Sequence, residues 1–245
     1  MKSIELLEGL CLDEIIGVIK YEPVVPACLA GQVRGAFPGD VPKTDEERVQ
    51  KLEHVINRHH GREFYRSEKL DGSSTTIYLK DEFGVCSRNM NLTETEGNLF
   101  WQTVRKLDVE RKITAYSEAH GGKSFSLQGE LVGPGIQNNK LKLKEVTLYF
   151  FNILDITEDR FLNLDEVIEA LAEMDLKMVP VIERIVLNHT IDELVEVATH
   201  KSIINPSVEA EGDVWRPVVE NTDPDIGRLS FKAINPKFLL KHEDV

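Results

Sequence analysis

The chain has 245 residues, with 29 lysines and arginines against 42 aspartates and glutamates, which gives a formal net charge of −13. Hydrophobic residues make up 41% and charged residues 29%, proportions that exclude a disordered or collagen-like chain and fit one large folded domain. The acidic balance argues against a protein that coats nucleic acid through bulk charge alone, although a local basic groove is compatible with it.

The apolar segments and the cysteines indicate in which compartment the protein is expected. No apolar run approaches the roughly 18 residues of a membrane-spanning helix, and Glu5 interrupts the pattern of a signal peptide. We therefore expect no membrane segment and a cytoplasmic location. The cysteines Cys11, Cys28 and Cys86 lie far apart, without the close pairs of metal sites or disulfide frameworks.

The first part of the chain predicts a loop and then a helix. Prolines and glycines are frequent between residues 21 and 42, which predicts an ordered loop. The segment Thr44–Glu47 has the pattern of a capping box, and apolar residues at helical spacing follow it until Gly61. These signals predict a helix from about Asp45 to His60.

Strands and helices are interleaved along the rest of the chain, as judged from apolar runs, alternation and helical spacing. The expected strands are Glu63–Lys69, Thr75–Lys80, Gly84–Arg88, Ser126–Val132, Val146–Asp155, Lys177–Glu183, Gly212–Val219 and Leu229–Ala233. The expected helices are Asn98–Leu107, Asp108–His120, Leu164–Met174, Ile191–His200 and Pro236–Lys241. Because no regular strand–helix repeat is visible, we predict an α+β fold with mostly antiparallel sheets.

The segment Glu68–Ser74 is the first candidate for chemistry. It places Lys69 at the end of a predicted strand, and Asp71 and Gly72 in the following turn. A lysine is nucleophilic only when neutral, so its pKa of about 10.4 must be lowered by desolvation or by nearby cations. Taken alone, the pattern fits an Asp-Gly hairpin beside a surface lysine equally well.

Further segments in a fixed order distinguish the two interpretations. They are Ser87–Asn89, Gln128–Gly133, Tyr149–Asp155, Glu211–Arg216 and Ser230–Lys237. In this order they closely resemble the covalent nucleotidyltransferase superfamily, specifically its ATP-dependent RNA ligases. The resemblance extends from about Ile16 to Lys241 and includes Lys43–Gln50, which is similar to the segment that carries a phosphate-contacting arginine in RNA ligases.

The resemblance implies a nucleotidyltransferase fold, with sheets flanked by helices around an ATP cleft, in one adenylyltransferase domain over residues 1–245. It also implies a reaction in three steps. A lysine attacks the α-phosphate of ATP and keeps AMP, AMP passes to an RNA 5′-phosphate, and an RNA 3′-hydroxyl displaces it. Such steps require in-line positioning and positive charge on the phosphates.

By this resemblance Lys69 is the nucleophile. The acids around the catalytic divalent ion, Mg²⁺ or Mn²⁺, are Asp71, Glu130 and Glu211. Magnesium prefers oxygen ligands and retains several waters, so these carboxylates hold either the ion or its hydration shell.

Two basic residues match catalytic positions of the family. Arg88 matches an arginine that approaches the nucleotide ribose and the RNA end, and its guanidinium suits paired oxygens. Lys232 matches the lysine that contacts the α-phosphate. The chain departs from the family here, because Ser230 stands where many members have the first lysine of Lys-x-Lys.

The remaining predicted nucleotide-binding residues are Arg48, Glu68 and Phe151. Arg48 is expected to contact outer phosphates, and Glu68 to place backbone groups against the adenine edge. Phe150 and Phe151 point to opposite faces of their strand, and we expect Phe151 to stack on adenine.

Two other groups of residues have less specific patterns. The adjacent His59 and His60 lack the i, i+4 spacing of a helical metal pair and are typical of a helix end. Lys140, Lys142 and Lys144 alternate along an expected strand, which fits either an RNA-phosphate track or a solvated face.

The expected substrate is RNA with 3′-hydroxyl and 5′-phosphate ends, at breaks in structured or duplex RNA. In the branch that the chain most resembles, an OB module precedes this domain, and residues 1–15 resemble the linker from such a module. We therefore expect an OB module or partner protein to act in trans. The alternatives are another covalent nucleotidyltransferase, either a DNA ligase or a capping enzyme, or a non-catalytic nucleotide- or RNA-binding module.

Overall fold

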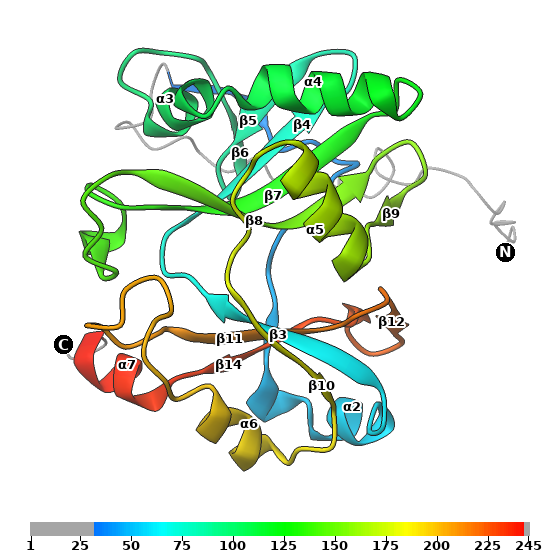
Figure 1. The fold of residues 1–245 in the computed structure, drawn as a ribbon, viewed down its shortest axis with the longest axis vertical. Coiled ribbons are helices and arrows are strands. Elements are labelled where there is room, and N and C mark those ends of the chain that lie inside the picture. The colour runs from blue at the N-terminus through cyan, green and yellow to red at the C-terminus, as the bar shows by residue number, and fades with distance from the viewer. Residues whose placement is uncertain (1–31, 243–245) are drawn as a thin grey trace, which may run out of the picture.

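Two sheets make up most of the computed structural model, which describes residues 32–242 (Figure 1). The larger sheet has the strand order β1-β6-β5-β4-β7-β8-β9 and the smaller has the order β10-β3-β11-β14-β2. In the described residues every strand pair of the two sheets is antiparallel except β2 with β14. The predicted α+β class is confirmed. The linker predicted for residues 1–15 lies outside the described residues, as do Cys11 and Cys28.

The larger sheet consists of β1 (Val33–Ala36), β4 (Ser73–Leu79), β5 (Phe83–Cys86), β6 (Met90–Leu92), β7 (Phe125–Val132), β8 (Thr147–Asp155) and β9 (Arg160–Phe161). It carries the helices α3 (Leu99–Lys106), α4 (Val109–Ala119) and α5 (Leu164–Glu173). Apolar side chains of these helices, such as Ile113 and Val167, pack with Leu127 and Phe150 of the sheet in one buried core. Burial of such side chains contributes about 1.5–3 kcal/mol each.

The smaller sheet consists of β2 (Glu47–Arg48), β3 (Glu63–Lys69), β10 (Val181–Val186), β11 (Gly212–Pro217) and β14 (Phe231–Ile234). Below it in Figure 1 lie α2 (Glu53–Arg58) and α6 (Ile191–Val197), with α7 (Pro236–His242) at one end. Trp215 and Phe231 stack nearly parallel in this second core, with ring centroids 6.2 Å apart. A small hairpin, β12 (Thr222–Asp223) with β13 (Gly227–Arg228), completes the strands.

The predicted helix from Asp45 to His60 is only partly correct. The hydroxyl of Thr44 lies 2.7 Å from that of Ser74, so it does not cap a helix. Glu47–Arg48 pairs in parallel with β14, a short 3-10 turn follows, and the α-helix begins at Glu53. Likewise, β1 lies inside the predicted loop and pairs with β6. In both segments, pairing with distant strands prevailed over the local signals.

The two strands around Asp71-Gly72 do not form a hairpin. Strand β3 belongs to the smaller sheet and β4 to the larger one, so the turn carries the chain from one sheet to the other. A Cβ atom at Gly72 would lie 2.3 Å from the carbonyl oxygen of Leu131. The close approach of this crossover to β7 therefore requires glycine.

A second crossover links the sheets near Met178. The backbone of Phe150 bonds to both Lys177 and Val179, at 2.8 Å each, before the chain enters β10. The strand predicted at Lys177–Glu183 is therefore displaced, with its first residues beside β8 and β10 ending at Val186.

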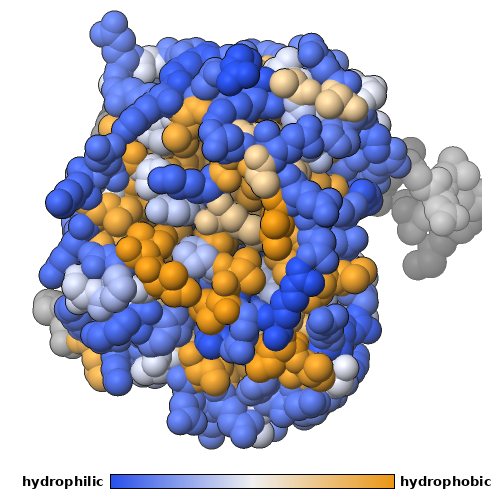
Figure 2. Space-filling view, viewed as in Figure 1, coloured by the Kyte–Doolittle hydropathy of each residue, from blue (hydrophilic) through white to orange (hydrophobic). Residues whose placement is uncertain are grey.

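In the same view, the surface is mostly hydrophilic, and hydrophobic residues gather toward the middle of the face (Figure 2). Within residues 32–242, no helix has the length and apolar character needed to cross a membrane.

Candidate active site

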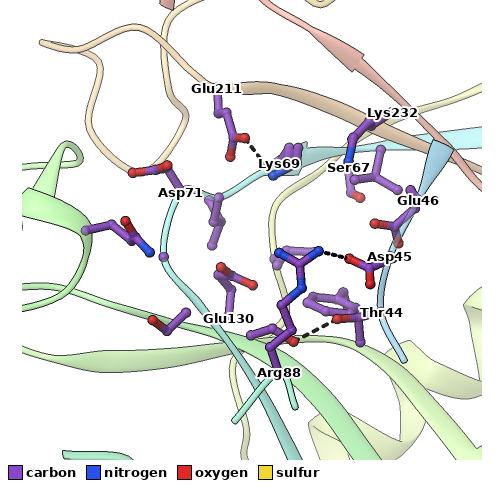
Figure 3. Close-up of a pocket in the computed structure, with 18 of the residues that line it drawn as sticks. Thr44, Asp45, Glu46, Ser67, Lys69, Asp71, Arg88, Glu130, Glu211 and Lys232 are labelled. Atoms are coloured by element: carbon purple, nitrogen blue, oxygen red, sulfur yellow. Dashed lines mark hydrogen bonds and ion pairs between the residues drawn. The ribbon is translucent and has the colours of Figure 1, made fainter. Parts of the chain in front are cut away.

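A cavity of about 540 Å³ is lined by residues of both sheets. Eight of the nine predicted site residues line it: Glu68, Lys69, Asp71, Arg88, Glu130, Phe151, Glu211 and Lys232. Figure 3 shows Lys69, Glu211 and Lys232 on one side and Glu130 and Arg88 on the other. The ninth, Arg48, is exposed on β2, where it lies opposite Lys232 in the register with β14.

Lys69 is the last residue of β3, where the strand reaches the cavity. It lies opposite Gly212 of β11, which brings the preceding residue, Glu211, next to it. The Lys69 Nζ donates a hydrogen bond to Glu211 Oε1 at 2.7 Å, and the two side chains are 23% and 16% exposed. Gly212 has a φ of +146°, and a Cβ atom there would lie 2.1 Å from the Ala233 carbonyl oxygen, so this approach of β11 to β14 requires glycine.

The amine of Lys69 is charged in this structure. Burial acts to lower its pKa, but Glu211, Glu130 and Glu46 together raise that pKa above its ordinary value. An opposite charge within hydrogen-bond distance favours the protonated amine. A nucleophilic Lys69 therefore requires additional positive charge beside these acids.

The three predicted metal-binding acids surround the same region of the cavity. Asp71 Oδ1 accepts a hydrogen bond from Lys140 Nζ at 3.1 Å, whereas Asp71 Oδ2 and Glu211 Oε2 are buried without a hydrogen-bond partner among residues 32–242. Burial raises the pKa of Glu211, and Lys69 and Lys140 only partly oppose it. For Glu130, burial and the neighbouring acids raise the pKa to about 8. This surplus of buried carboxylate oxygens fits a divalent cation.

The arrangement of the acidic side chains bears on how a metal ion could be held. Among residues 32–242, no group of three or more His, Cys, Asp or Glu side chains is arranged to hold a metal ion directly. Mg²⁺ retains several waters in most protein sites, so carboxylates such as those of Asp71, Glu130 and Glu211 can hold the ion itself or its hydration shell.

Lys232 on β14 is the second lysine in the lining of the cavity. Burial and the positive charge of Lys69 lower the pKa of Lys232. Ser230, where the resemblance implies an additional lysine, is buried, and its hydroxyl has no hydrogen-bond partner among the described residues.

Sequence analysis missed Arg216 and Glu46, both of which line the cavity. Arg216 is 2% exposed, and its Nη2 donates to Glu46 Oε1 at 2.6 Å. Its guanidinium carbon lies 5.5 Å from the centroid of the Phe151 ring, which also faces the cavity. Both residues lie inside segments that carried the resemblance. The sequence signal that could have identified Arg216 was an arginine within an apolar strand.

The mouth of the cavity is formed by two short segments, one around Asp45 and one around Arg88. Arg88 pairs with Asp45, and both side chains are more than half exposed. Beside this pair, Lys43 Nζ donates to Asn89 Oδ1 at 2.8 Å. The arginine predicted to approach the RNA end therefore lies where a large substrate has access.

Glu68 does not present its side chain to solvent. Its carboxylate is 2% exposed and accepts a hydrogen bond from the Ile203 backbone N–H at 2.8 Å. Its own backbone N–H donates to the Pro180 carbonyl oxygen at 2.9 Å. Glu68 is predicted to place backbone groups against the adenine edge, and its N–H could do so only in place of the bond to Pro180.

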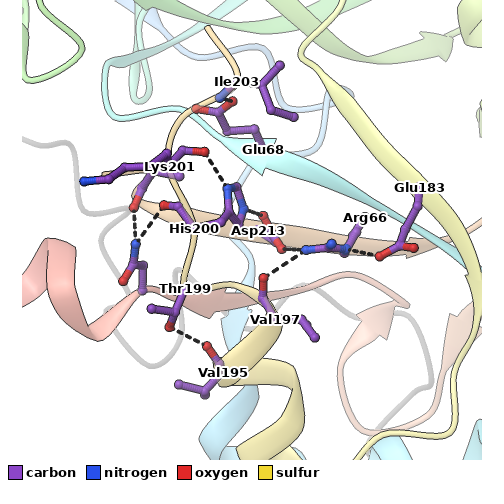
Figure 4. A network of polar contacts seen from close by, with 12 residues as sticks. Arg66, Glu68, Glu183, Val195, Val197, Thr199, His200, Lys201, Ile203 and Asp213 are labelled. Carbon is purple, nitrogen blue, oxygen red and sulfur yellow. Dashed lines mark hydrogen bonds and ion pairs between the residues drawn. The ribbon is translucent and has the colours of Figure 1, made fainter. Parts of the chain in front are cut away.

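A charged network lies beside Glu68 on β3 and β11 (Figure 4). Arg66 Nη1 donates to Asp213 Oδ2 at 2.8 Å, and His200 Nε2 lies 2.8 Å from Asp213 Oδ1. His200 Nδ1 lies 2.8 Å from the Lys201 carbonyl oxygen. Both ring nitrogens face acceptors, which requires the doubly protonated ring, and Asp213 raises the pKa of His200 accordingly. The network fastens together the strands that carry Lys69 and Glu211.

The other histidines and lysines fall outside the cavity lining. Buried His59 lies 2.8 Å from Asp223 Oδ2, which indicates a structural role. The strand predicted for Lys140, Lys142 and Lys144 is wrong, because this segment is a loop after a 3-10 turn. Lys140 alone is shown to contact a predicted site residue.

Together, a lysine at the end of a strand, a cleft between two antiparallel sheets and a ring of carboxylates define the nucleotidyltransferase class. The sequence profile of the RNA ligase family matches residues 62–234, and the chain belongs to this family. A comparison with curated proteins gave no match.

Solved structures agree with this assignment. The Naegleria gruberi RNA ligase with PPi is 36% identical, with a TM-score of 0.80, over 96% of this chain and 67% of that chain. A lysine-to-alanine variant of that ligase with ATP and Mn is 35% identical, with a TM-score of 0.80, over 97% and 68%. A lysine-to-methionine variant with AMP and Mn is 35% identical, with a TM-score of 0.80, over 96% of this chain and 68% of that chain. The predicted RNA ligase enzyme class and nucleotidyltransferase fold are confirmed.

Proposed function

We propose that this chain is the adenylyltransferase domain of an ATP-dependent RNA ligase and that Lys69 is its nucleophile. The position of Lys69 supports this most directly, since its amine lies in the cleft, 2.7 Å from a carboxylate. The Naegleria gruberi ligase has been solved with ATP and Mn, AMP and Mn, and PPi. ATP is the substrate and PPi the leaving group of such a first step, and AMP is the group that the lysine keeps.

In this step the ammonium group of Lys69 first releases a proton to become a neutral amine, and Glu211, which already accepts a hydrogen bond from it, takes up that proton. Lys69 Nζ then forms a bond to the α-phosphorus, the bond to the bridging oxygen of PPi breaks, and the nitrogen releases a second proton to solvent. A divalent cation held by Asp71, Glu130 and Glu211 would supply positive charge that lowers the pKa of Lys69 and offsets charge on the phosphate.

The positions of Lys232, Phe151 and Arg48 support the nucleotide contacts proposed for them. Lys232 lies on the strand beside β11 and is placed to contact the α-phosphate of a nucleotide on Lys69. Phe151, supported by Arg216, offers a ring face to the adenine. We retain Arg48 as a contact to the outer phosphates, because it lies on β2 opposite Lys232.

The later steps bring RNA ends to the cavity mouth. AMP passes to a 5′-phosphate, and a 3′-hydroxyl displaces it, at breaks in structured or duplex RNA. Arg88 at the mouth is suited to the incoming phosphate. The net charge of −13 supports the expectation that an OB module or partner protein contributes RNA contacts. A cytoplasmic location remains a prediction from the sequence.

The test is incubation of the full chain with ATP and Mg²⁺, followed by intact-mass measurement. We expect one added AMP on the wild-type chain and none on Lys69→Arg, which keeps the charge of the side chain but is a far weaker nucleophile. Asp71→Ala, Glu130→Ala and Glu211→Ala should each lower labelling by about 100-fold or more, the scale seen when a key electrostatic group is removed. Labelling of Lys69→Arg at the wild-type level would contradict the assignment.

Substrate competition in the same assay separates the family alternatives. ATP should label the chain and GTP should not. Labelling by GTP would favour the capping enzyme alternative. Nicked duplexes with RNA 3′-ends should be sealed in preference to those with DNA 3′-ends. Equal sealing of both would favour the DNA ligase alternative.

A further inference from the structure

Lys140 lies in the connection between β7 and β8, outside the segments that resemble the family motifs. Four non-glycine residues of this loop have left-handed backbone conformations: Gln137, Asn138, Asn139 and Lys142, with φ of 43°, 58°, 48° and 53°. The amide of Asn139 bonds to both backbone groups of Leu143, at 2.8 and 3.0 Å. The loop therefore has a defined shape.

The same loop is held by the part of the chain that follows α6. Leu141 is buried, and its carbonyl oxygen accepts a hydrogen bond from Asn205 Nδ2 at 2.9 Å. Lys140 is thus fixed between a connection of the larger sheet and a segment that leads into the smaller one.

The ammonium group of Lys140 is placed between an acid and an aromatic ring. Its Nζ lies 3.1 Å from Asp71 Oδ1 and 5.0 Å from the centroid of the Phe238 ring. The side chain is 22% exposed and that of Asp71 is 16% exposed. A surface lysine would project into water, whereas this one is a partly desolvated cation with two partners.

This contact changes what a second cation encounters at Asp71. One carboxylate oxygen is paired with Lys140, and the other is buried without a hydrogen-bond partner in the part of the chain that the structure describes. A divalent ion beside the free oxygen would be repelled by the Lys140 ammonium through a medium that screens charge less than bulk water. The triphosphate of ATP carries negative charge, which would offset this repulsion.

We propose that Lys140 is a positioning residue that keeps the affinity of the acidic site for a free divalent cation low, so that the cation binds tightly only together with ATP. Lys140 holds Asp71 in place and carries the charge that discourages an ion from entering alone. The part of the inference that concerns ATP rests on the proposed function, whereas the contact with Asp71 does not.

The test measures the affinity of the full chain for Mn²⁺ without nucleotide, by electron paramagnetic resonance of the free ion. Lys140→Gln keeps a hydrogen-bond donor but removes the charge, and we expect its Kd for Mn²⁺ to fall by about five-fold or more. Lys140→Arg should remain within about two-fold of wild type, as should Lys142→Gln, the exposed control on the same loop. A non-hydrolysable ATP analogue should reduce the difference between Lys140→Gln and wild type.

An unchanged or weaker Mn²⁺ affinity in Lys140→Gln would overturn the proposal, because the charge would then not oppose the ion. If Lys140→Gln does not fold, as judged by circular dichroism, Lys140→Met keeps the aliphatic chain beside Phe238 and should show the same tighter binding. Failure of the proposed function is a separate outcome: the wild-type chain would then gain no AMP, while the Mn²⁺ affinities would still decide the role of Lys140.

Discussion

Around the cavity, the acidic side chains are only partly neutralised by lysines, which leaves room for a bound cation. Lys69 and Lys140 each pair with one carboxylate, while Glu130 has no ion-pair partner within hydrogen-bond distance among the described residues. In the absence of a cation, Glu130 is held largely protonated at neutral pH, since its pKa is raised to about 8. The site is therefore arranged for binding and chemistry at the expense of stability.

Glu130→Gln should show this effect in metal-free buffer. The folded pKa of about 8 exceeds the ordinary value of 4.5, so the folded state binds a proton that the unfolded chain has lost, and stability decreases as pH rises between these values. The variant should nearly match wild type near pH 5 and be more stable at pH 9 by about 4 kcal/mol, or roughly 10 °C in Tm. Thermal melts in EDTA at both pH values provide the measurement.

Measuring both stability and adenylylation of Glu130→Gln separates the two roles of this residue. Lysine adenylylation should be lost at both pH values although the protein is more stable. A variant that is less stable than wild type at pH 9 would show that Glu130 carries a favourable charge, contrary to the cause assigned here.

At the scale of elements, the pairing of β3 with β11 places Lys69 beside Glu211. The strands are joined by their ladder and by the Arg66, Asp213 and His200 network. Asp213 is fully buried, so its charge requires both cationic partners.

His200→Gln should weaken this pairing in a pH-dependent way. Because Asp213 raises the pKa of His200, the stabilisation is fully present below the unfolded pKa of about 6.5 and is lost as pH rises through the folded pKa. The variant should lose about 1–2 kcal/mol at pH 6 and less at pH 9. Urea unfolding at both pH values measures the difference.

The control for this prediction is His60→Gln, an exposed histidine that leaves the network intact. Equal losses for His200→Gln at pH 6 and pH 9 would indicate that the ring contributes only through packing. A loss confined to pH 9 would contradict the assignment of a charged His200.

At the scale of the whole molecule, the cavity lies where the two sheets meet. Asp71 and Gly72 lie in one crossover between the sheets, and Met178 lies in the other. A ligand in the cavity contacts residues of both sheets, and its binding should therefore stabilise them together.

Calorimetry of Lys69→Ala, which cannot form the covalent product, tests this coupling. Ligand at about 100 times its Kd adds about 2.7 kcal/mol, so Mn²⁺ with ATP should raise the Tm by roughly 5–10 °C in a single transition. ATP in EDTA should give a smaller shift. A second transition that the ligand does not move would show that the two sheets unfold independently.

Local sequence patterns were sufficient to predict many helices and strands, but not which strands pair with one another. The apolar run of β8 and the capping box before α6 predict elements that the structure contains. The predicted capping box at Thr44 instead lies at the cavity, because the pairing of Glu47–Arg48 with β14 outweighed local preference. The predicted lysine strand is a loop, in which Asn139 bonds to the backbone of Leu143. The ordered segments also indicated eight residues that now line one cavity.

Sequence alone determined which chemistry is available here, because the order of the segments around Lys69, Asp71, Glu130, Glu211 and Lys232 defines the family. Only the tertiary structure decided the electrostatics. It showed a charged Lys69, a buried Arg216 beside Phe151, and a Lys140 that reaches Asp71 across 69 positions of the chain. The physical reason is that pKa values and ion pairs depend on burial and distance in space, which spacing along a chain does not specify.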